Sequence, residues 1–306
     1  MRTLRSLRLR GAAALAIGFV VATSIAAAPA RRAARPPAQA AAKHMLFRVR
    51  GASGATVFLL GSVHLLTPEA GQLPPVVDSV FARAKSVTFE TSLDSLQMRA
   101  TELLALARNA SGVTLRSALT PPGAAKADSI LKGYGLSLDQ LGQFKPWFVS
   151  LLMTQVVMRK AGFQAQYGVD AQLNARAHAA NKPVGELEPV DFQLHLFDSL
   201  TPAEQEQMLV AGSPPDSSAA HMVQIKDAWL TGNVAALDST LNKSLSEAPG
   251  LFAKLVVERN ERWVPQIEAM LAGKDDALVV VGAAHLVGKH GVVELLRAKG
   301  YTVDQL

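Results

Sequence analysis

Two histidines occur in matching contexts near opposite ends of the chain. His64 closes the stretch FLLGSVH, and His285 closes the stretch VVVGAAH. Each histidine therefore follows an apolar, strand-like run and the pattern Gly-x-x-His. An imidazole in such a place can ligate a divalent metal ion or transfer a proton. One Gly-x-x-His alone is usually structural, but two in similar contexts favour a shared site.

Two carboxylates stand at the ends of further strand-like runs. Glu90 follows Val87–Phe89, and Glu188 follows Val184–Leu187. Ligands of α/β sheets bind beyond the carboxyl ends of the strands, so these side chains are expected near the two histidines. Two imidazoles with one or two carboxylates are a sufficient set of ligands for a divalent metal ion. Ser62, or the backbone N–H groups of the same turn, would face a bound anion.

Simpler explanations remain open for several of these residues. Glu90 could be a surface charge or a neighbour of a helix start, and Glu188 could cap a helix that starts near Val190. In the charged patch ERNERW, Glu258 to Trp263, a solvated helix face explains Glu261 and Arg262, and spacing alone does not decide the position of Arg259. No role is assigned to the five other histidines, which are His44, His178, His195, His221 and His290.

Strands are expected early and late in the chain, with a mainly helical block between them. Together they predict an α/β fold in which the first and last strand–helix units share a sheet and a helical insertion covers about residues 95–272. The expected strands are Met45–Arg50, Thr56–Leu60, Ser86–Thr91, Pro183–Leu187, Asp276–Val281 and Tyr301–Gln305. The expected helices are Pro74–Lys85, Ser95–Ala107, Ala124–Tyr134, Lys145–Gly162, Val169–Ala180, Pro202–Val210, His221–Leu230, Val234–Leu245, Phe252–Leu271 and Gly291–Lys299.

The composition excludes several classes of site. The 306 residues include no cysteine, which rules out disulfides, thiolate metal sites and a lipid-modified cysteine anchor. A metal ion would need histidine and carboxylate ligands. The formal charge is +6, but four arginines precede residue 11, and without them it falls to +2. No basic cluster with interleaved aromatic residues follows, so nucleic acid is not an expected partner.

The N-terminal residues predict export. Four arginines precede an apolar stretch from Gly11 to Ala28, and small residues follow, as in a secretory signal peptide. We expect residues 1–30 to be the signal peptide, with cleavage after Ala30 favoured over Ala28. Residues 31–44 form a low-complexity lead-in, and residues 45–306 form the folded domain. The protein would then be periplasmic or secreted, with no membrane span after cleavage; an uncleaved membrane anchor is the alternative.

The motifs together resemble the TraB/PrgY/GumN family, which also includes the animal Tiki proteins. The matching elements, in order, are FLLGSVHLL, VTFETS, KPWFVSLL, YGVDAQL, PVGELEPVDFQL, AWLTGN, VERNERW and VVVGAAHLVGKHGVVELLRAKGYTV. The bacterial GumN-like branch is the most similar. The resemblance implies a fold related to the erythromycin-esterase and ChaN-like proteins, with a mixed sheet flanked by helices and a helical insertion.

The resemblance also implies a metal-dependent peptidase, as in the Tiki branch. It places the metal ligands at His64, His285 and Glu90, and it favours manganese or cobalt, with zinc possible. The remaining matches are Glu188 in the family's LE pair, Arg259 and Asn260 in its RN pair, and Asp170 in its GVD element. The family often has a second carboxylate shortly after the early acid, but here Thr91 and Ser92 follow, so the ligand set at this end stays open.

The predicted function is therefore an exported metal-dependent hydrolase, with a peptidase favoured, whose partner is a peptide or small-molecule substrate. Glu188 would be the general base, and Arg259 would stabilise an oxyanion or bind a substrate carboxylate. Ser62, Asp170 and Asn260 would contact substrate. Asp170 could exchange its role with that of Glu188 or Arg259. The alternative is a protein that captures a peptide without cleaving it. An esterase acting on small molecules is a third reading and depends on fold kinship alone.

Overall fold

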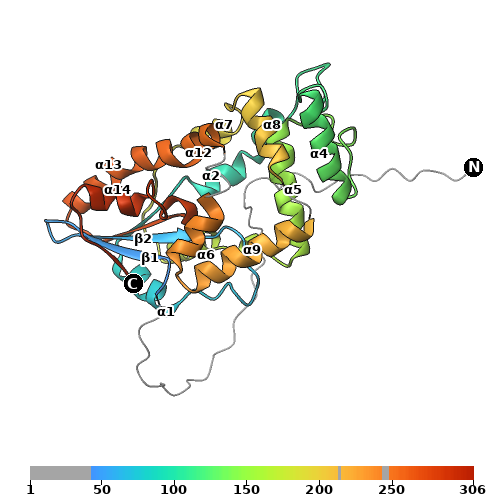
Figure 1. Cartoon of the computed structure of the whole chain (residues 1–306). Coiled ribbons are helices and arrows are strands. Elements are labelled where there is room, and N and C mark those ends of the chain that lie inside the picture. The colour runs from blue at the N-terminus through green and yellow to red at the C-terminus, as the bar shows by residue number, and fades with distance from the viewer. Residues whose placement is uncertain (1–42, 213–214, 243–247) are drawn as a thin grey trace, which may run out of the picture.

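The computed structural model describes residues 43–212, 215–242 and 248–306. Its centre is a six-stranded sheet with the strand order β4-β3-β5-β2-β1-β6 (Figure 1). The strands are β1 (Leu46–Arg50), β2 (Thr56–Ser62), β3 (Ser86–Phe89), β4 (Val184–Glu186), β5 (Ala277–Gly282) and β6 (Val303–Gln305). The predicted signal peptide and most of the predicted lead-in lie outside the described residues.

Four strands form a parallel block. β2 and β3 both pair in parallel with β5, and β4 pairs in parallel with β3, whereas β1 runs antiparallel to β2 and to β6. The prediction that early and late strands share one sheet is confirmed. β2 is buried along its whole length, as expected of a strand covered on both faces. The carboxyl ends of β2, β3, β4 and β5 therefore meet at one edge of the sheet.

Helices surround the sheet and extend beyond it. They are α1 (Pro75–Arg83), α2 (Leu93–Met98), α3 (Ala100–Leu106), α4 (Pro121–Gly133), α5 (Pro146–Lys160), α6 (Val169–Ala179), α7 (Val190–Leu196), α8 (Pro202–Val210), α9 (Pro215–Leu230), α10 (Val234–Leu237), α12 (Pro249–Phe252), α13 (Glu258–Ala272) and α14 (Val292–Ala298). Figure 1 shows α4, α5 and α8 grouped away from the sheet, and an apolar cluster of their own, including Leu131, Val149 and Leu209, packs them together. The α/β prediction with a largely helical insertion is confirmed, although β4 returns to the sheet from within the insertion.

Three predicted helices differ from those observed. The run predicted as Val234–Leu245 contains α10 followed by a π-helical segment, Asp238–Asn242. The run predicted as Phe252–Leu271 contains a π-helical segment, Ala253–Val257, before α13 begins at Glu258. The run predicted as Ser95–Ala107 is divided at Arg99, whose φ of −99° and ψ of 16° depart from helical geometry. A π turn shifts side chains by one position along the helix, so apolar spacing alone does not reveal it. None of the helices in the described residues is long and apolar enough to span a bilayer.

Candidate active site

The predicted metal ligands converge at the carboxyl edge of the sheet. His64 follows β2, Glu90 follows β3, and His285 ends a 3₁₀ turn after β5. A methyl carbon built on Gly282 would lie 3.2 Å from Glu90 Oε1, 3.6 Å from His285 Cδ2 and 4.0 Å from His64 Nε2. Three side chains from distant parts of the chain thus approach one point. The glycine of the second Gly-x-x-His motif leaves this point free of a side chain.

The orientation of the His285 ring is fixed by Asn260. The Asn260 amide nitrogen donates to the carbonyl of His290 at 2.8 Å, so its oxygen faces His285 Nδ1 at 2.7 Å. Nδ1 therefore carries the proton, and the lone pair lies on Nε2. Burial lowers the pKa of His285 to about 3, so the ring is neutral at pH 7.

His64 is held in the same manner by a different residue. Its Nδ1 lies 2.9 Å from Oδ2 of Asp170, in the first turn of α6. A Cβ on Gly168 would lie 2.1 Å from the His64 carbonyl oxygen, so glycine allows α6 to approach the histidine loop. Asp170 is buried, whereas the His64 side chain is 57% exposed. The Asp170 carboxylate raises the pKa of His64 above its ordinary value.

Arg259 occupies the centre of the site. It lies in the first turn of α13 and is only 5% exposed, which decides the position that spacing alone left open, whereas Glu261 and Arg262 are exposed as predicted. Its Nε donates to Glu188 at 3.0 Å, and its terminal NH2 group donates to Glu188 at 2.5 Å and to Glu90 at 2.6 Å. Its NH1 group donates to His285 Nε2 at 3.1 Å. The guanidinium group therefore joins both carboxylates and one imidazole.

Glu188 is buried and saturated with hydrogen bonds. Beyond Arg259, it accepts hydrogen bonds from Trp263 Nε1 at 3.2 Å and from the side chain of Gln193. The alternative that Glu188 caps a helix is wrong, because the N-cap of α7 is Pro189 and no side chain caps that helix. With donors on both oxygens, the carboxylate is well placed to hold Arg259 in position. Before Glu188 can take a proton, at least one donor must leave.

Glu90 is a charged carboxylate that lies largely away from solvent. Its Oε1 accepts a hydrogen bond from the backbone N–H of Gly282 at 2.6 Å, and Oε2 accepts one from Arg259. Its side chain is 15% exposed, which corrects the alternative of a plain surface charge. Burial alone would raise the pKa of Glu90, but the charge of Arg259 holds that pKa well below its ordinary value.

The donor chemistry of the site fits a divalent metal ion. Both Nδ1 atoms are engaged by acceptors, and such orienting contacts are typical of metal-ligating histidines. Because the pKa of His64 is raised to about 9, an ion bound to its Nε2 would displace a proton from that atom at pH 7. The hydroxyl oxygens of Ser62 and Thr91 are buried without a hydrogen-bond partner among the described residues. Ser62 pairs in register with Gly282, so its side chain lies on the face of the sheet that carries the site. In the present arrangement, no three His, Asp or Glu side chains of the described ranges form a compact ligand group.

The structure adds contacts that the sequence reasoning missed. Trp263 donates to Glu188 and lies under the guanidinium of Arg259, whose Cζ is 4.7 Å from the centre of the indole ring. Its position four residues after Arg259 on one helix could have indicated this stacking. Asp170 and Asn260, predicted to contact substrate, each contact a histidine. No sequence signal pointed to Gln193.

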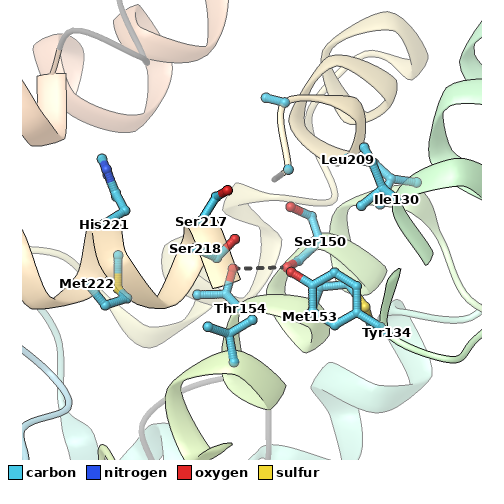
Figure 2. Close-up of a pocket in the computed structure, with 13 residues that line it drawn as sticks. Ile130, Tyr134, Ser150, Met153, Thr154, Leu209, Ser217, Ser218, His221 and Met222 are labelled. Carbon is cyan, nitrogen blue, oxygen red and sulfur yellow. Dashed lines mark hydrogen bonds between the residues drawn. The ribbon is translucent and has the colours of Figure 1, made fainter. Parts of the chain in front are cut away.

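A separate cavity lies in the helical insertion. It measures about 450 Å³ and is bounded by α4, α5, α8 and α9 (Figure 2). Its polar side chains are largely used within the protein: Ser150 donates to the Met208 carbonyl, and Thr154 donates to the Ser150 carbonyl. Among the described residues, its lining includes a single imidazole, that of His221, and no carboxylate or predicted site residue. Nothing in this lining indicates catalytic chemistry.

Comparison with known proteins agrees with the expected resemblance. The family model described as TraB/PrgY/gumN matches residues 45–305. A protein of Escherichia coli (strain K12) named "Uncharacterized protein YbaP" is 24% identical over 239 residues, which cover 78% of this chain and 87% of that protein. The protein of the same name from Shigella flexneri matches equally. No solved structure matches the chain. Because the family model spans nearly all of the described residues, the chain belongs to the TraB/PrgY/gumN family.

Proposed function

We propose that the protein is an exported metal-dependent hydrolase that acts on peptides. One observation carries the proposal: two histidines from opposite ends of the chain have their Nδ1 atoms engaged, and they approach one point together with Glu90. Histidines oriented in this way, beside a carboxylate, are typical of catalytic metal sites. Export rests on the N-terminal sequence pattern, and the peptide substrate rests on the resemblance to the Tiki branch.

His64, His285 and Glu90 would hold the ion, with manganese or cobalt favoured and zinc possible. A bound divalent ion supplies a Lewis acid and lowers the pKa of bound water. Asp170 and Asn260 keep the two imidazoles in the tautomer whose Nε2 faces the site. These contacts make both residues positioning residues, in place of the substrate contacts expected from the sequence.

Arg259 supplies positive charge beside the reacting groups. Its guanidinium is charged because Glu90 and Glu188 raise the pKa of Arg259 against the opposing effect of burial. A fixed cation at this place stabilises negative charge that develops on a substrate carbonyl oxygen. We propose that Glu188 acts by holding Arg259 rather than as general base, since both of its oxygens already accept hydrogen bonds. The hydroxyl of Ser62, which has no hydrogen-bond partner among the described residues, would contact substrate.

Turnover of a peptide library in the presence of Mn²⁺ tests this function. We expect H64A and H285A each to abolish cleavage, while H178A leaves it unchanged. His178 is a matched control because it forms an exposed His–Asp pair with Asp94 at 2.8 Å, away from the site. Cleavage that continues undiminished in either site variant would refute the metal mechanism. Peptide binding that survives chelation, with no product formed, would favour the sequestering alternative.

A further inference from the structure

His285 offers one lone pair to any partner, and Arg259 already uses it. An imidazole that carries its proton on Nδ1 has a single lone pair, located on Nε2. The Asn260 amide fixes that tautomer, because its nitrogen is committed to the His290 carbonyl. The Arg259 NH1 group donates to this same Nε2 atom at 3.1 Å. A metal ion and the NH1 group therefore cannot occupy His285 at the same time.

Arg259 also engages the proposed carboxylate ligand. Its NH2 group donates to Glu90 Oε2 at 2.6 Å, while Glu90 Oε1 accepts the Gly282 N–H. A carboxylate oxygen has a second lone pair, so this contact weakens a competing ligand bond without excluding it. The positive charge of the guanidinium further opposes a divalent cation nearby. The hydrogen bonds and the positive charge of Arg259 therefore both oppose metal binding by His285 and Glu90.

Other contacts of Arg259 would persist if NH1 left the histidine. Nε and NH2 are bound to Glu188, NH1 also donates to the Leu255 carbonyl at 3.2 Å, and the group lies over Trp263. The guanidinium is thus anchored through Nε and NH2, which do not contact His285. NH1 can therefore leave His285 while these two nitrogens stay bound to Glu188.

We propose that Arg259 competes with the metal ion for His285, so that metal binding is an exchange of the guanidinium for the ion. This inference rests on the metal site of the proposed function. The hydrogen bond from a charged donor that must be broken corresponds to a loss of about tenfold or more in metal affinity. Arg259 thereby sets the metal concentration at which the protein becomes loaded.

The test is Mn²⁺ affinity, measured from the electron paramagnetic resonance signal of free Mn²⁺ during titration of metal-free protein. The key variant is E188Q/R259M, which removes one carboxylate and one cation and so keeps the net charge of the site unchanged. Methionine has no donor for His285. R259K is the second variant, because lysine keeps a charge for Glu188 but lacks the fork that reaches two partners at once.

We expect E188Q/R259M to bind Mn²⁺ about tenfold more tightly than the wild type. Should the double variant fail to fold, as judged by circular dichroism, R259K must still bind Mn²⁺ more tightly than the wild type. If a folded variant binds Mn²⁺ as weakly as the wild type or more weakly, the proposed competition is overturned. The metal site itself is tested separately: it is upheld if the wild type binds Mn²⁺ and H64A does not. No Mn²⁺ binding in the wild type and in both variants would overturn the proposed metal site and this inference together.

Discussion

Replacing Glu188 by glutamine measures how strongly the buried charge network supports the fold. The substitution keeps the shape of the side chain but removes its charge, and it places an amide nitrogen among donors from Arg259, Trp263 and Gln193. Losing one partner of a buried ion pair costs about 3–5 kcal/mol, because the other charge stays buried. In E188Q, Arg259 keeps its ion pair with Glu90 at 2.6 Å. We therefore expect a loss of unfolding free energy at the lower end of this range, about 3 kcal/mol.

Urea denaturation at pH 7 with a chelator present gives the free energy of unfolding without a contribution from bound metal. The matched control is E186Q, since Glu186 is exposed and only its contact with the Ser92 N–H is affected. We expect E186Q to lower the free energy of unfolding by less than about 0.5 kcal/mol. In a double-mutant cycle, E188Q should cost much less in the R259M background, where no buried cation is left unpaired. The reasoning fails if E188Q costs no more than E186Q, or if the two substitutions are additive.

Three further predictions concern the histidine contacts, the glycine at the convergence point and a carboxylate remote from the site. D170A and N260A should each weaken Mn²⁺ binding about 10–100-fold in calorimetric titrations, whereas D94A, which breaks the exposed His–Asp pair, should leave it unchanged. G282A should abolish Mn²⁺-dependent turnover at a stability cost below about 1 kcal/mol, because its methyl group would enter the point shared by the ligands; full activity would contradict the proposed location of the site. D276A should destabilise the protein by about 1–3 kcal/mol at pH 7, because Asp276 accepts a buried backbone N–H at the start of β2 at 2.7 Å. Burial would raise the pKa of Asp276, but Arg83 and this N–H lower it. The stabilisation by Asp276 is therefore present above its unfolded pKa of about 4 and is lost as the pH falls below that value. If the difference in unfolding free energy between D276A and the wild type stayed constant down to pH 2 in urea titrations, this reasoning would be refuted.

Local sequence patterns were sufficient to place the four candidate site residues at strand ends. The apolar runs before His64 and His285, and the shorter runs before Glu90 and Glu188, form β2, β5, β3 and β4 as predicted. A run of strand-forming residues followed by a polar residue predicts that this residue lies at the end of a strand. Because parallel strands end at one edge, this information alone predicted that the four residues are neighbours.

The same patterns did not predict the helix irregularities. The π segment Ala253–Val257 precedes α13 directly, and Arg259 is buried in the first turn of that helix. A solvated face explained Glu261 and Arg262 of ERNERW, but spacing left the position of Arg259 undecided, and composition gave no indication of the carboxylates that compensate its charge. Such compensation becomes visible only when partners distant in the sequence are brought together.

The sequence by itself determined the α/β class, the strand ends that carry His64, His285, Glu90 and Glu188, and the family. Only the tertiary structure decided the partners of those side chains: Asp170 on one histidine, Asn260 on the other, and Arg259 between the two carboxylates. The physical reason is that strand and turn preferences are local. A hydrogen bond between groups 106 or 169 residues apart depends instead on how α6 and α13 pack against the edge of the sheet.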